Sequence, residues 1–171
     1  DIERLQTTPG RLVQPLESSS IDAWIKFYRR DENTPNTGIS YYVKGAVLGF
    51  LLDAHIRKLT DGAKSLDDVL RVAYARYSGE KGYTPDEFRR VASDVAGSDL
   101  TGWFDHALKT TGELDYSEAL AWYGLRFQSP KQDDQKNPSK AWLGLETKNQ
   151  SGQLLVDVVK RGTPGFDAGF Q

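Results

Sequence analysis

The sequence predicts a mainly α-helical bundle followed by a C-terminal β-hairpin. Two observations indicate this fold class. Between residues 40 and 124 apolar side chains recur at helical spacing, and after residue 141 they fall in two short runs that are typical of strands. With 38% hydrophobic and 27% charged residues in a chain of 171, a folded core is expected rather than disorder.

The segment 40–59 is the strongest predicted helix. Tyr42, Ala46, Phe50 and Ala54 share one of its faces, and valine and leucine side chains cover most of the remainder. A helix that is apolar nearly all round is expected to be buried on several sides. The bundle should therefore pack around this helix.

Four further helices are expected, each opened by a residue that can cap an N-terminus. They begin at Ser65, Thr84, Ser98 and Asp115, and they end near residues 77, 97, 112 and 124. In three of them an acidic residue (Asp68, Glu87 or Glu118) follows the cap after three positions, which is the spacing of a capping box. The first of these helices is expected to bury a stripe made of Leu66, Val69, Leu70, Ala73 and Tyr77.

The N-terminal part and the stretch after the helices carry weaker patterns. Residues 1–39 are expected to be irregular because proline, glycine and asparagine interrupt them, although residues 21–28 could form a short helix or a strand. Residues 128–140 are polar and contain two prolines, which is a linker composition.

Near the C-terminus the spacing of apolar residues changes from a helical to a strand pattern. Two strands, 142–147 and 153–159, should flank a turn at 149–152, and a short helix should begin at Thr163. The expected domain organisation is a helical domain at residues 1–126, a linker at 127–140 and a C-terminal segment at 141–171.

Composition excludes several kinds of chemistry. Without cysteine there can be no disulfide, thiolate nucleophile or cysteine-bound zinc. A net charge of -2 without a basic stripe argues against a nucleic-acid partner, and no apolar run reaches the roughly 18 residues that a membrane span requires. The two histidines, His55 and His106, fall on different predicted helices and no H-E-x-x-H motif is present, so each is expected to be a structural or a surface residue. From spacing alone no catalytic site can be assembled.

One run stands out at the start of the central predicted helix. It reads Ser40-Tyr41-Tyr42-Val43-Lys44-Gly45. On the residues alone, the two tyrosines are best explained as large core side chains with a polar tip.

This run belongs to a series of sequence blocks along the chain. The blocks are SIDAWIKFYRRDEN from Ser20, ISYYVKGA from Ile39, LDAHIR from Leu52, SLDDV from Ser65, GYT from Gly82, VAGSDL from Val95 and EAL from Glu118. Their order and spacing resemble the glycyl aminopeptidase family of zinc metallopeptidases. The resemblance covers roughly residues 9–125 and implies the C-terminal part of a catalytic domain similar to thermolysin and aminopeptidase N. In that family the zinc ligands, an H-E-x-x-H motif and a glutamate, lie upstream of such a segment. Zinc would therefore belong to the parent enzyme, and this chain alone is expected to hold no metal and to be inactive.

The same resemblance assigns a role to Tyr42. The Tyr-x-Lys-Gly pattern is similar to the Tyr-Glu-Lys-Gly of aminopeptidase N-like enzymes, in which the tyrosine donates a hydrogen bond to the oxyanion. Carried over by motif, that donor is Tyr42, with Val43 in place of the glutamate and with Tyr41 directed elsewhere. The implied reaction of the parent enzyme is the release of small N-terminal residues, such as glycine or alanine, from peptide substrates.

The C-terminal segment resembles the first half of a bacterial PDZ domain. The resemblance rests on Trp142-Leu143-Gly144-Leu145 and on residues 158–170, and PDZ domains take peptide C-termini by β-augmentation. So short a segment buries little surface and leaves strand edges unpaired. It is expected either to lie against the helical bundle or to pair residues 141–171 with a second copy, which would make a homodimer.

The absence of methionine, even at position 1, indicates a part of a longer protein. A rival interpretation is a non-catalytic helical scaffold that carries a PDZ-like peptide-binding adaptor. In that case Tyr41 and Tyr42 would be ordinary core residues.

Overall fold

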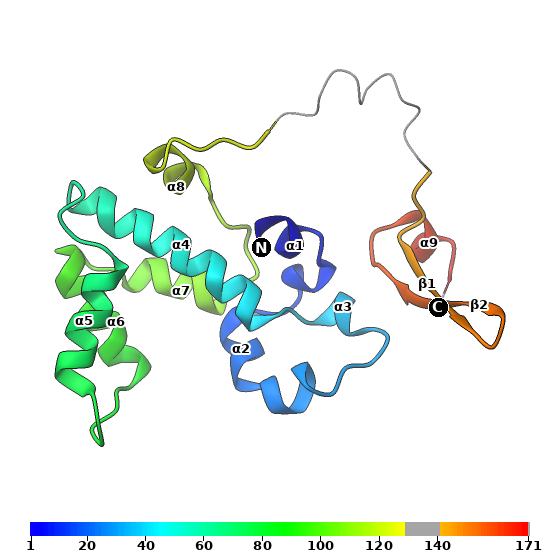
Figure 1. The fold of residues 1–171 in the computed structure, drawn as a ribbon, viewed down its shortest axis with the longest axis horizontal. Coiled ribbons are helices and arrows are strands. Elements are labelled where there is room, and N and C mark those ends of the chain that lie inside the picture. The colour runs from blue at the N-terminus through cyan, green and yellow to red at the C-terminus, as the bar shows by residue number, and fades with distance from the viewer. Residues whose placement is uncertain (129–140, 171) are drawn as a thin grey trace. The chain divides into compact units, whose positions relative to one another are not determined.

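The computed structural model describes residues 1–128 and 141–170, which are mainly helical and end in an antiparallel hairpin (Figure 1). This confirms the predicted fold class. The chain forms two compact units: residues 42–126 together with Asp1, and residues 2–41 together with those from Phe127 onward. All but the first two residues of the predicted linker lie outside the described part of the chain.

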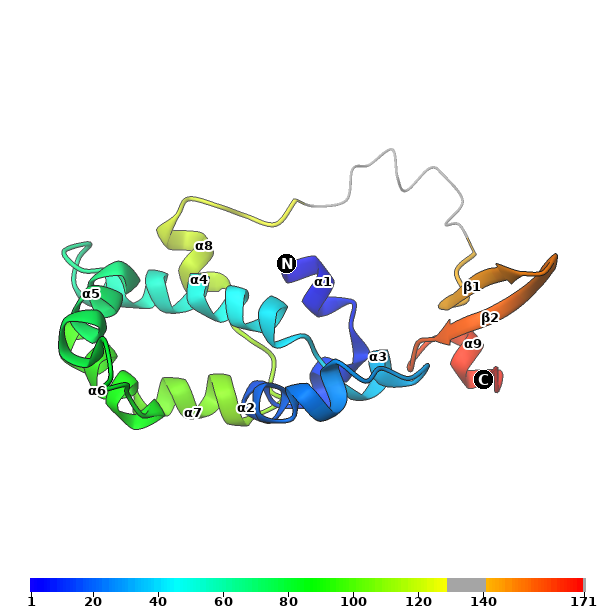
Figure 2. The same ribbon diagram turned by 60° about the horizontal axis from the view of Figure 1, so that its bottom comes forward.

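Five helices make up the first unit: α4 (Tyr41–Leu59), α5 (Leu66–Tyr77), α6 (Pro85–Ala96), α7 (Thr101–Lys109) and α8 (Ser117–Trp122). Figure 2 shows α4 and α7 in separate layers, with α5 and α6 at the end of the unit where α4 stops and α7 starts. No helix in the described ranges is long and apolar enough to cross a bilayer.

Two predicted capping boxes are confirmed. The backbone N–H of Ser65 donates to Asp68 Oδ2 at 2.9 Å, and that of Thr84 donates to Glu87 Oε2 at 2.7 Å. In the second box the backbone N–H of Glu87 also donates to Thr84 Oγ1, at 3.3 Å. Gly97 ends α6 in the left-handed conformation, at φ 66°, as its position in the sequence predicts.

The core of this unit joins the end of α4 to three other helices. Its buried side chains are Leu52, Ile56, Val69, Ala73, Val91, Ala92, Ala96, Leu100 and Phe104. The prediction for the α5 stripe is wrong at Leu70, which is 52% exposed. Val69 and Ala73 define the buried line, and Leu70 is turned about 100° away from Val69. Val72, a turn after Val69, packs against the core instead, as do the predicted Leu66 and Tyr77.

The predicted face of α4 also needs correction. Tyr42 is 61% exposed and Ala46 is exposed, whereas Lys44 is only 3% exposed. The buried side of the first turns is formed by Val43, Lys44, Val47 and Leu48. Burial therefore follows a narrower stripe than the apolar pattern indicates.

Two predicted helix starts differ from those observed. Helix α7 begins at Thr101 rather than Ser98, and α8 begins at Ser117. Asp115 accepts from the backbone N–H of Ser117 at 2.8 Å, but Glu118 does not complete a box because its carboxylate pairs with side chains of α4.

The N-terminal part, predicted to be irregular, consists of short helical turns. They are α1 (Ile2–Gln6), a 3₁₀ turn (Pro9–Leu12), α2 (Leu16–Ile21), a π-helical turn (Ala23–Phe27) and α3 (Thr34–Thr37). Of the two conformations left open for residues 21–28, the helical one is observed.

Contacts between distant residues hold these turns together. Ser19 Oγ donates to the carbonyl of Ile39 at 2.8 Å, and the N–H of Ile39 donates to Gln14 Oε1 at 3.1 Å. A Cβ atom at Gly10 would lie 2.1 Å from the carbonyl oxygen of Gly38, so only glycine fits there. The chain is thereby fixed just before it enters α4.

The predicted hairpin forms and its second strand has the predicted bounds, but the first strand begins at Leu145 rather than residue 142 and extends to Gln150, into the predicted turn. Strands β1 (Leu145–Gln150) and β2 (Gln153–Val159) pair antiparallel, with a register shift between Glu146 and Thr147. Both residues of the connecting turn, Ser151 and Gly152, have positive φ, as a two-residue hairpin turn requires. Helix α9 (Pro164–Asp167) follows directly after Thr163.

Asn36 of α3 bonds to the hairpin within the second unit. Its Nδ2 donates to the carbonyl of Val159 at 2.7 Å, and its Oδ1 accepts from the N–H of Arg161 at 2.8 Å. Asn36 is 4% exposed. One buried amide therefore satisfies both backbone groups at the end of β2.

Candidate functional site

The first turn of α4 directs two adjacent tyrosines into different environments. The ring of Tyr41 packs edge-on against Phe27 at 5.2 Å between centroids, and its hydroxyl lies 3.1 Å from that of Tyr28. Tyr42, one position further round the helix, is 61% exposed. The exposure of Tyr42 disagrees with its interpretation as an ordinary core residue, whereas the packing of Tyr41 agrees with it.

Lys44 lies on the opposite side of the same turn and was not anticipated from the sequence. It is 3% exposed. Burial lowers the pKa of the Lys44 ammonium, and the carboxylate of Glu113 partly offsets this. A signal was present, because Lys44 is three and four positions before Val47 and Leu48 and therefore shares their face.

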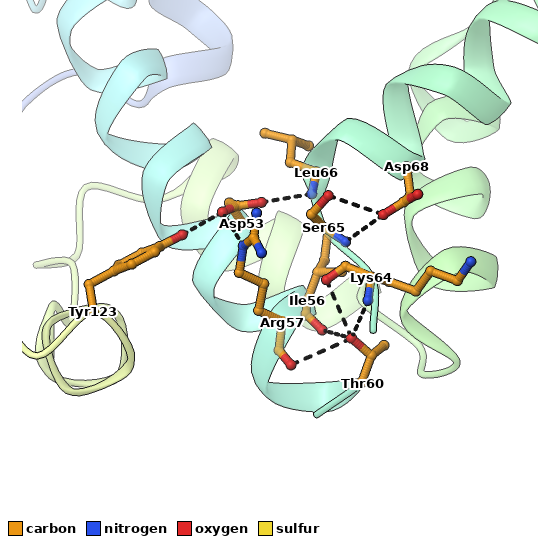
Figure 3. A network of polar contacts seen from close by, with 9 residues as sticks. All are labelled: Asp53, Ile56, Arg57, Thr60, Lys64, Ser65, Leu66, Asp68 and Tyr123. Atoms are coloured by element: carbon orange, nitrogen blue, oxygen red, sulfur yellow. Dashed lines mark hydrogen bonds and ion pairs between the residues drawn. The ribbon is translucent and has the colours of Figure 1, made fainter. Parts of the chain in front are cut away.

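Further along α4, Asp53 connects three segments (Figure 3). Its carboxylate accepts from Arg57 Nε at 2.7 Å, from the backbone N–H of Leu66 at 2.8 Å and from the hydroxyl of Tyr123. Burial alone would raise the pKa of Asp53, but the hydrogen bonds from Tyr123, Arg57 and Leu66 hold it below its usual value. Asp53 thus joins the start of α5 and the end of α8 to α4.

The loop after α4 has its own polar contacts (Figure 3). Thr60 Oγ1 donates to the carbonyl of Ile56 at 2.8 Å and accepts from the N–H of Lys64 at 3.0 Å. The capping box at Ser65 and Asp68 continues this chain of contacts into α5. These bonds satisfy backbone groups of the turn, so they are structural.

His55 has a structural environment as well. Its Nδ1 lies 2.6 Å from Glu118 Oε1, and its ring stacks on Trp103 with centroids 6.3 Å apart. Lys58 Nζ donates to the other carboxylate oxygen of Glu118 at 2.8 Å. His55 and Lys58 therefore bind α8 to α4 through Glu118, a contact that no sequence pattern indicates.

Residues of the described ranges do not assemble a zinc site. Within those ranges no three histidine, aspartate or glutamate side chains converge as metal ligands. His106, on α7, instead lies against Gly112, where an added Cβ atom would be 3.0 Å from its Cε1. The side chains of the described ranges therefore do not provide a ligand set that fits zinc.

An open cavity of about 490 Å³ lies between α5 and α6. Its lining is largely aromatic and consists of Leu70, Arg71, Ala73, Tyr74, Tyr77, Ser78, Tyr83 and Phe88. Neither Tyr42 nor a histidine borders it. It is therefore separate from the first turn of α4.

Comparison with known proteins points to a peptidase. Residues 1–48 match the family model of the M61 glycyl aminopeptidases. The matched range includes the N-terminal turns, Tyr41, Tyr42 and the first part of α4. No match to a curated protein was found. The match supports a peptidase context for the start of α4, while the later helices and the hairpin lie outside the matched range.

Proposed function

We propose that this chain is part of a zinc-dependent aminopeptidase that releases small N-terminal residues, such as glycine or alanine, and that Tyr42 acts in its active site. The observation that carries the proposal is the placement of Tyr42. It lies within the range matched by the glycyl aminopeptidase family, and it stands 61% exposed on the first turn of α4, next to the buried Val43.

In the proposed reaction Tyr42 donates one hydrogen bond. When water attacks the carbonyl carbon of a peptide, negative charge develops on the carbonyl oxygen. A phenol has a pKa near 10, so at neutral pH its O–H is present and can donate to that oxygen. Zinc would be held by ligands outside this sequence, and the step assigned to Tyr42 does not depend on how they are arranged.

Such a donor is effective only if it is held in place before the reaction. Before Tyr42 in the chain, the N–H of Ile39 donates to Gln14 Oε1 and the carbonyl of Ile39 accepts from Ser19 Oγ. After Tyr42, Val43 and Val47 are buried. The backbone on either side of Tyr42 is therefore held by contacts within its own unit.

We also propose that residues 141–171 are the start of a PDZ-like domain of the same enzyme. Outside the ladder, the N–H of Lys160 donates to the carbonyl of Gly144 at 3.0 Å and the N–H of Gly165 donates to that of Leu143 at 2.8 Å. These bonds fold α9 back onto the segment that precedes β1. They are compatible with a peptide-binding module. The rival interpretation, a non-catalytic helical scaffold, also includes such a module, so these bonds do not distinguish the two.

The test is Tyr42→Phe in the full-length protein, assayed on glycyl and alanyl substrates. Loss of a single oxyanion donor typically costs on the order of a hundredfold or more in kcat. We expect a loss of that size with little change in KM, because the phenol acts on the transition state more than on the bound substrate.

Tyr41→Phe is the matched control. It removes a hydroxyl that contacts Tyr28 and should leave kcat within a few-fold of the wild type. If Tyr42→Phe retains wild-type kcat, Tyr42 has no catalytic role. If the full-length protein hydrolyses no aminopeptidase substrate in the presence of zinc, the scaffold interpretation is preferred.

A further inference from the structure

The cavity between α5 and α6 has a wall of aromatic rings. The ring centroid of Tyr83 lies 6.1 Å from that of Tyr77 and 5.9 Å from that of Phe88. Phe88 in turn meets the buried ring of Phe104 edge-on, with centroids 6.5 Å apart. Tyr77 and Phe88 also pack against the core of the first unit. The wall is therefore continuous with the core of the bundle.

The backbone on both sides of Tyr83 is fixed by local structure. On one side Gly82 has a φ of 61°, which side-chain-bearing residues rarely adopt. On the other side the N–H of Thr84 donates to Glu87 Oε2 at 2.7 Å in the capping box of α6. Tyr83 itself is 58% exposed. A ring that is held at its base and open to solvent is suited to packing against the ring of a ligand.

Exposed apolar side chains of α5 form another part of the lining. Leu70 is 52% exposed and Tyr74 is 76% exposed, and they share one face because they are four positions apart. A ligand that covers them removes apolar surface from water, which favours binding. The cavity volume of about 490 Å³ is in the range of ligand sites, roughly 300–1,000 Å³. Size and lining therefore favour a ligand with an aromatic group.

Arg71 determines the charge that such a ligand should carry. Among the lining residues that the structure describes, Arg71 alone is charged. Its Nη1 lies 3.3 Å from Asp68 Oδ1, and its side chain is 71% exposed. An exposed pair of this kind contributes little to stability, and a guanidinium has five N–H donors, so a second carboxylate can share it. Arg71 thus favours an anionic ligand and repels a cationic one.

We propose that this cavity binds the C-terminal residue of a peptide that ends in an aromatic side chain. The terminal ring would pack against Tyr77, Tyr83 and Phe88, and the terminal carboxylate would pair with Arg71. Arg71 and Tyr74 are three positions apart, with Cβ atoms about 5–6 Å from each other, so one terminal residue can reach both. Because the cavity is open, the rest of the peptide can extend into solvent. This site does not depend on the proposed role of Tyr42.

The experiment is calorimetric titration of the whole chain with acetyl-Gly-Gly-Phe, whose acetyl group prevents removal of its first residue by an aminopeptidase. We expect binding of one peptide per chain at about millimolar concentration or below. The C-terminal amide of the same peptide should bind about five- to tenfold more weakly, because it cannot form the ion pair. Acetyl-Gly-Gly-Ala, which has no ring, should show no binding in the same range.

Variants assign the two parts of the recognition. Arg71→Gln should reduce the affinity for the acid to that for the amide and leave the amide unaffected. Arg90→Gln, an exposed arginine of α6 that does not line the cavity, is the matched control and should bind as the wild type does. Tyr74→Ala should weaken the acid and the amide alike by severalfold. Its melting temperature should stay near that of the wild type, because the side chain is exposed and alanine suits a helix.

Four outcomes would overturn the proposal. The carboxylate has no role if the acid and the amide bind equally, or if Arg71→Gln and Arg90→Gln have the same effect. The ligand is a small aromatic acid rather than a peptide end if 3-phenylpropionate binds as tightly as the peptide. The cavity is a site for cations if phenyltrimethylammonium binds more tightly than the peptide. If none of these probes binds, the cavity is a surface recess without a ligand of this class.

Discussion

At the scale of single residues, Asp53 connects three segments of the first unit. One carboxylate receives hydrogen bonds from a side chain of its own helix, from the backbone at the start of α5 and from a tyrosine beyond α8. All three bonds favour the charged carboxylate. Together they outweigh burial, which by itself would raise the pKa of Asp53. The stability that Asp53 contributes should therefore depend on pH.

We predict an acid-dependent loss of stability that is specific to Asp53. Its pKa in the folded state lies below the unfolded value of about 3.9, so its contribution is complete above that pH and is lost as the pH falls through the folded pKa. At pH 7, Asp53→Asn should reduce the free energy of unfolding by about 1–3 kcal/mol, as for hydrogen bonds to a charged group.

Urea unfolding between pH 7 and pH 2 measures this effect. The difference between the wild type and Asp53→Asn should shrink toward zero at the acid end. Asp67→Asn, an exposed aspartate on α5, should cost much less and serves as control. A difference that stays constant over the whole pH range would show that the folded state does not favour ionised Asp53.

Two residues at the start of α4 show the limits of prediction from sequence. The apolar pattern placed Tyr42 in the core, because an aromatic ring on an apolar helix gives no sign of its direction. The catalytic role that the family resemblance implies for Tyr42 stays a prediction. Lys44 was missed for the opposite reason, since lysine is almost never buried without a partner. Glu113, whose charge partly offsets the effect of burial on the pKa of Lys44, lies far away in the sequence.

At the scale of elements, a helix end could be predicted where the contacts that define it join residues close together in the sequence. The starts of α5 and α6 and the end of α6 were predicted because their caps lie within three or four residues of each other. The turns before α4 were missed because each is too short to show a period, and because their bonds join residues 20 or more positions apart. The role of Glu118 was missed because its partners are on α4.

Replacing Asn36 tests whether the end of the β1–β2 hairpin depends on its hydrogen bonds to α3. Asn36→Ala would leave the carbonyl of Val159 and the N–H of Arg161 without their buried partner. An orphaned buried group of this kind costs on the order of 1–3 kcal/mol, so the hairpin end should open more often. We expect amide exchange at Arg161 to accelerate at least tenfold, together with a lower melting temperature.

Asn33→Ala provides the control for this variant. Asn33 Oδ1 accepts from Asn36 Nδ2 at 3.0 Å, but Asn33 makes none of the bonds to the hairpin described here. Its effect on exchange at Arg161 should be small. Equal effects of the two variants would mean that the hairpin does not depend on Asn36.

At the scale of the whole chain, the second unit combines residues that are far apart in sequence. Residues 2–41 belong with those from Phe127 onward, and the amide of Asn36 provides a specific bond between the two stretches. A sequence read from end to end cannot show such an association, because strand and helix patterns report only local conformation. The C-terminal segment should therefore not behave as an independent domain.

The last prediction concerns the partner of residues 141–171. Their hairpin has two strands and leaves large apolar side chains exposed, among them Leu154 at 73% and Trp142 at 63%. An isolated two-stranded hairpin is at best marginally stable in water, so these residues need further contacts. The contact with Asn36 supplies one, and a second copy of the chain would supply another through Trp142, Leu145, Leu155 and Val158.

A shortened chain that ends at Lys140 separates these possibilities when it is compared with the whole chain by light scattering and thermal melting. If the segment stabilises its own chain, the shortened form should melt several degrees lower while both forms are monomers, since about 1 kcal/mol shifts the melting temperature of a domain this size by 2–4 °C or more. If the segment pairs two copies, the whole chain alone should be a dimer with a concentration-dependent melting temperature. Both ideas fail if both forms are monomers with one melting temperature and residues 141–171 exchange their amide hydrogens as fast as an unfolded peptide.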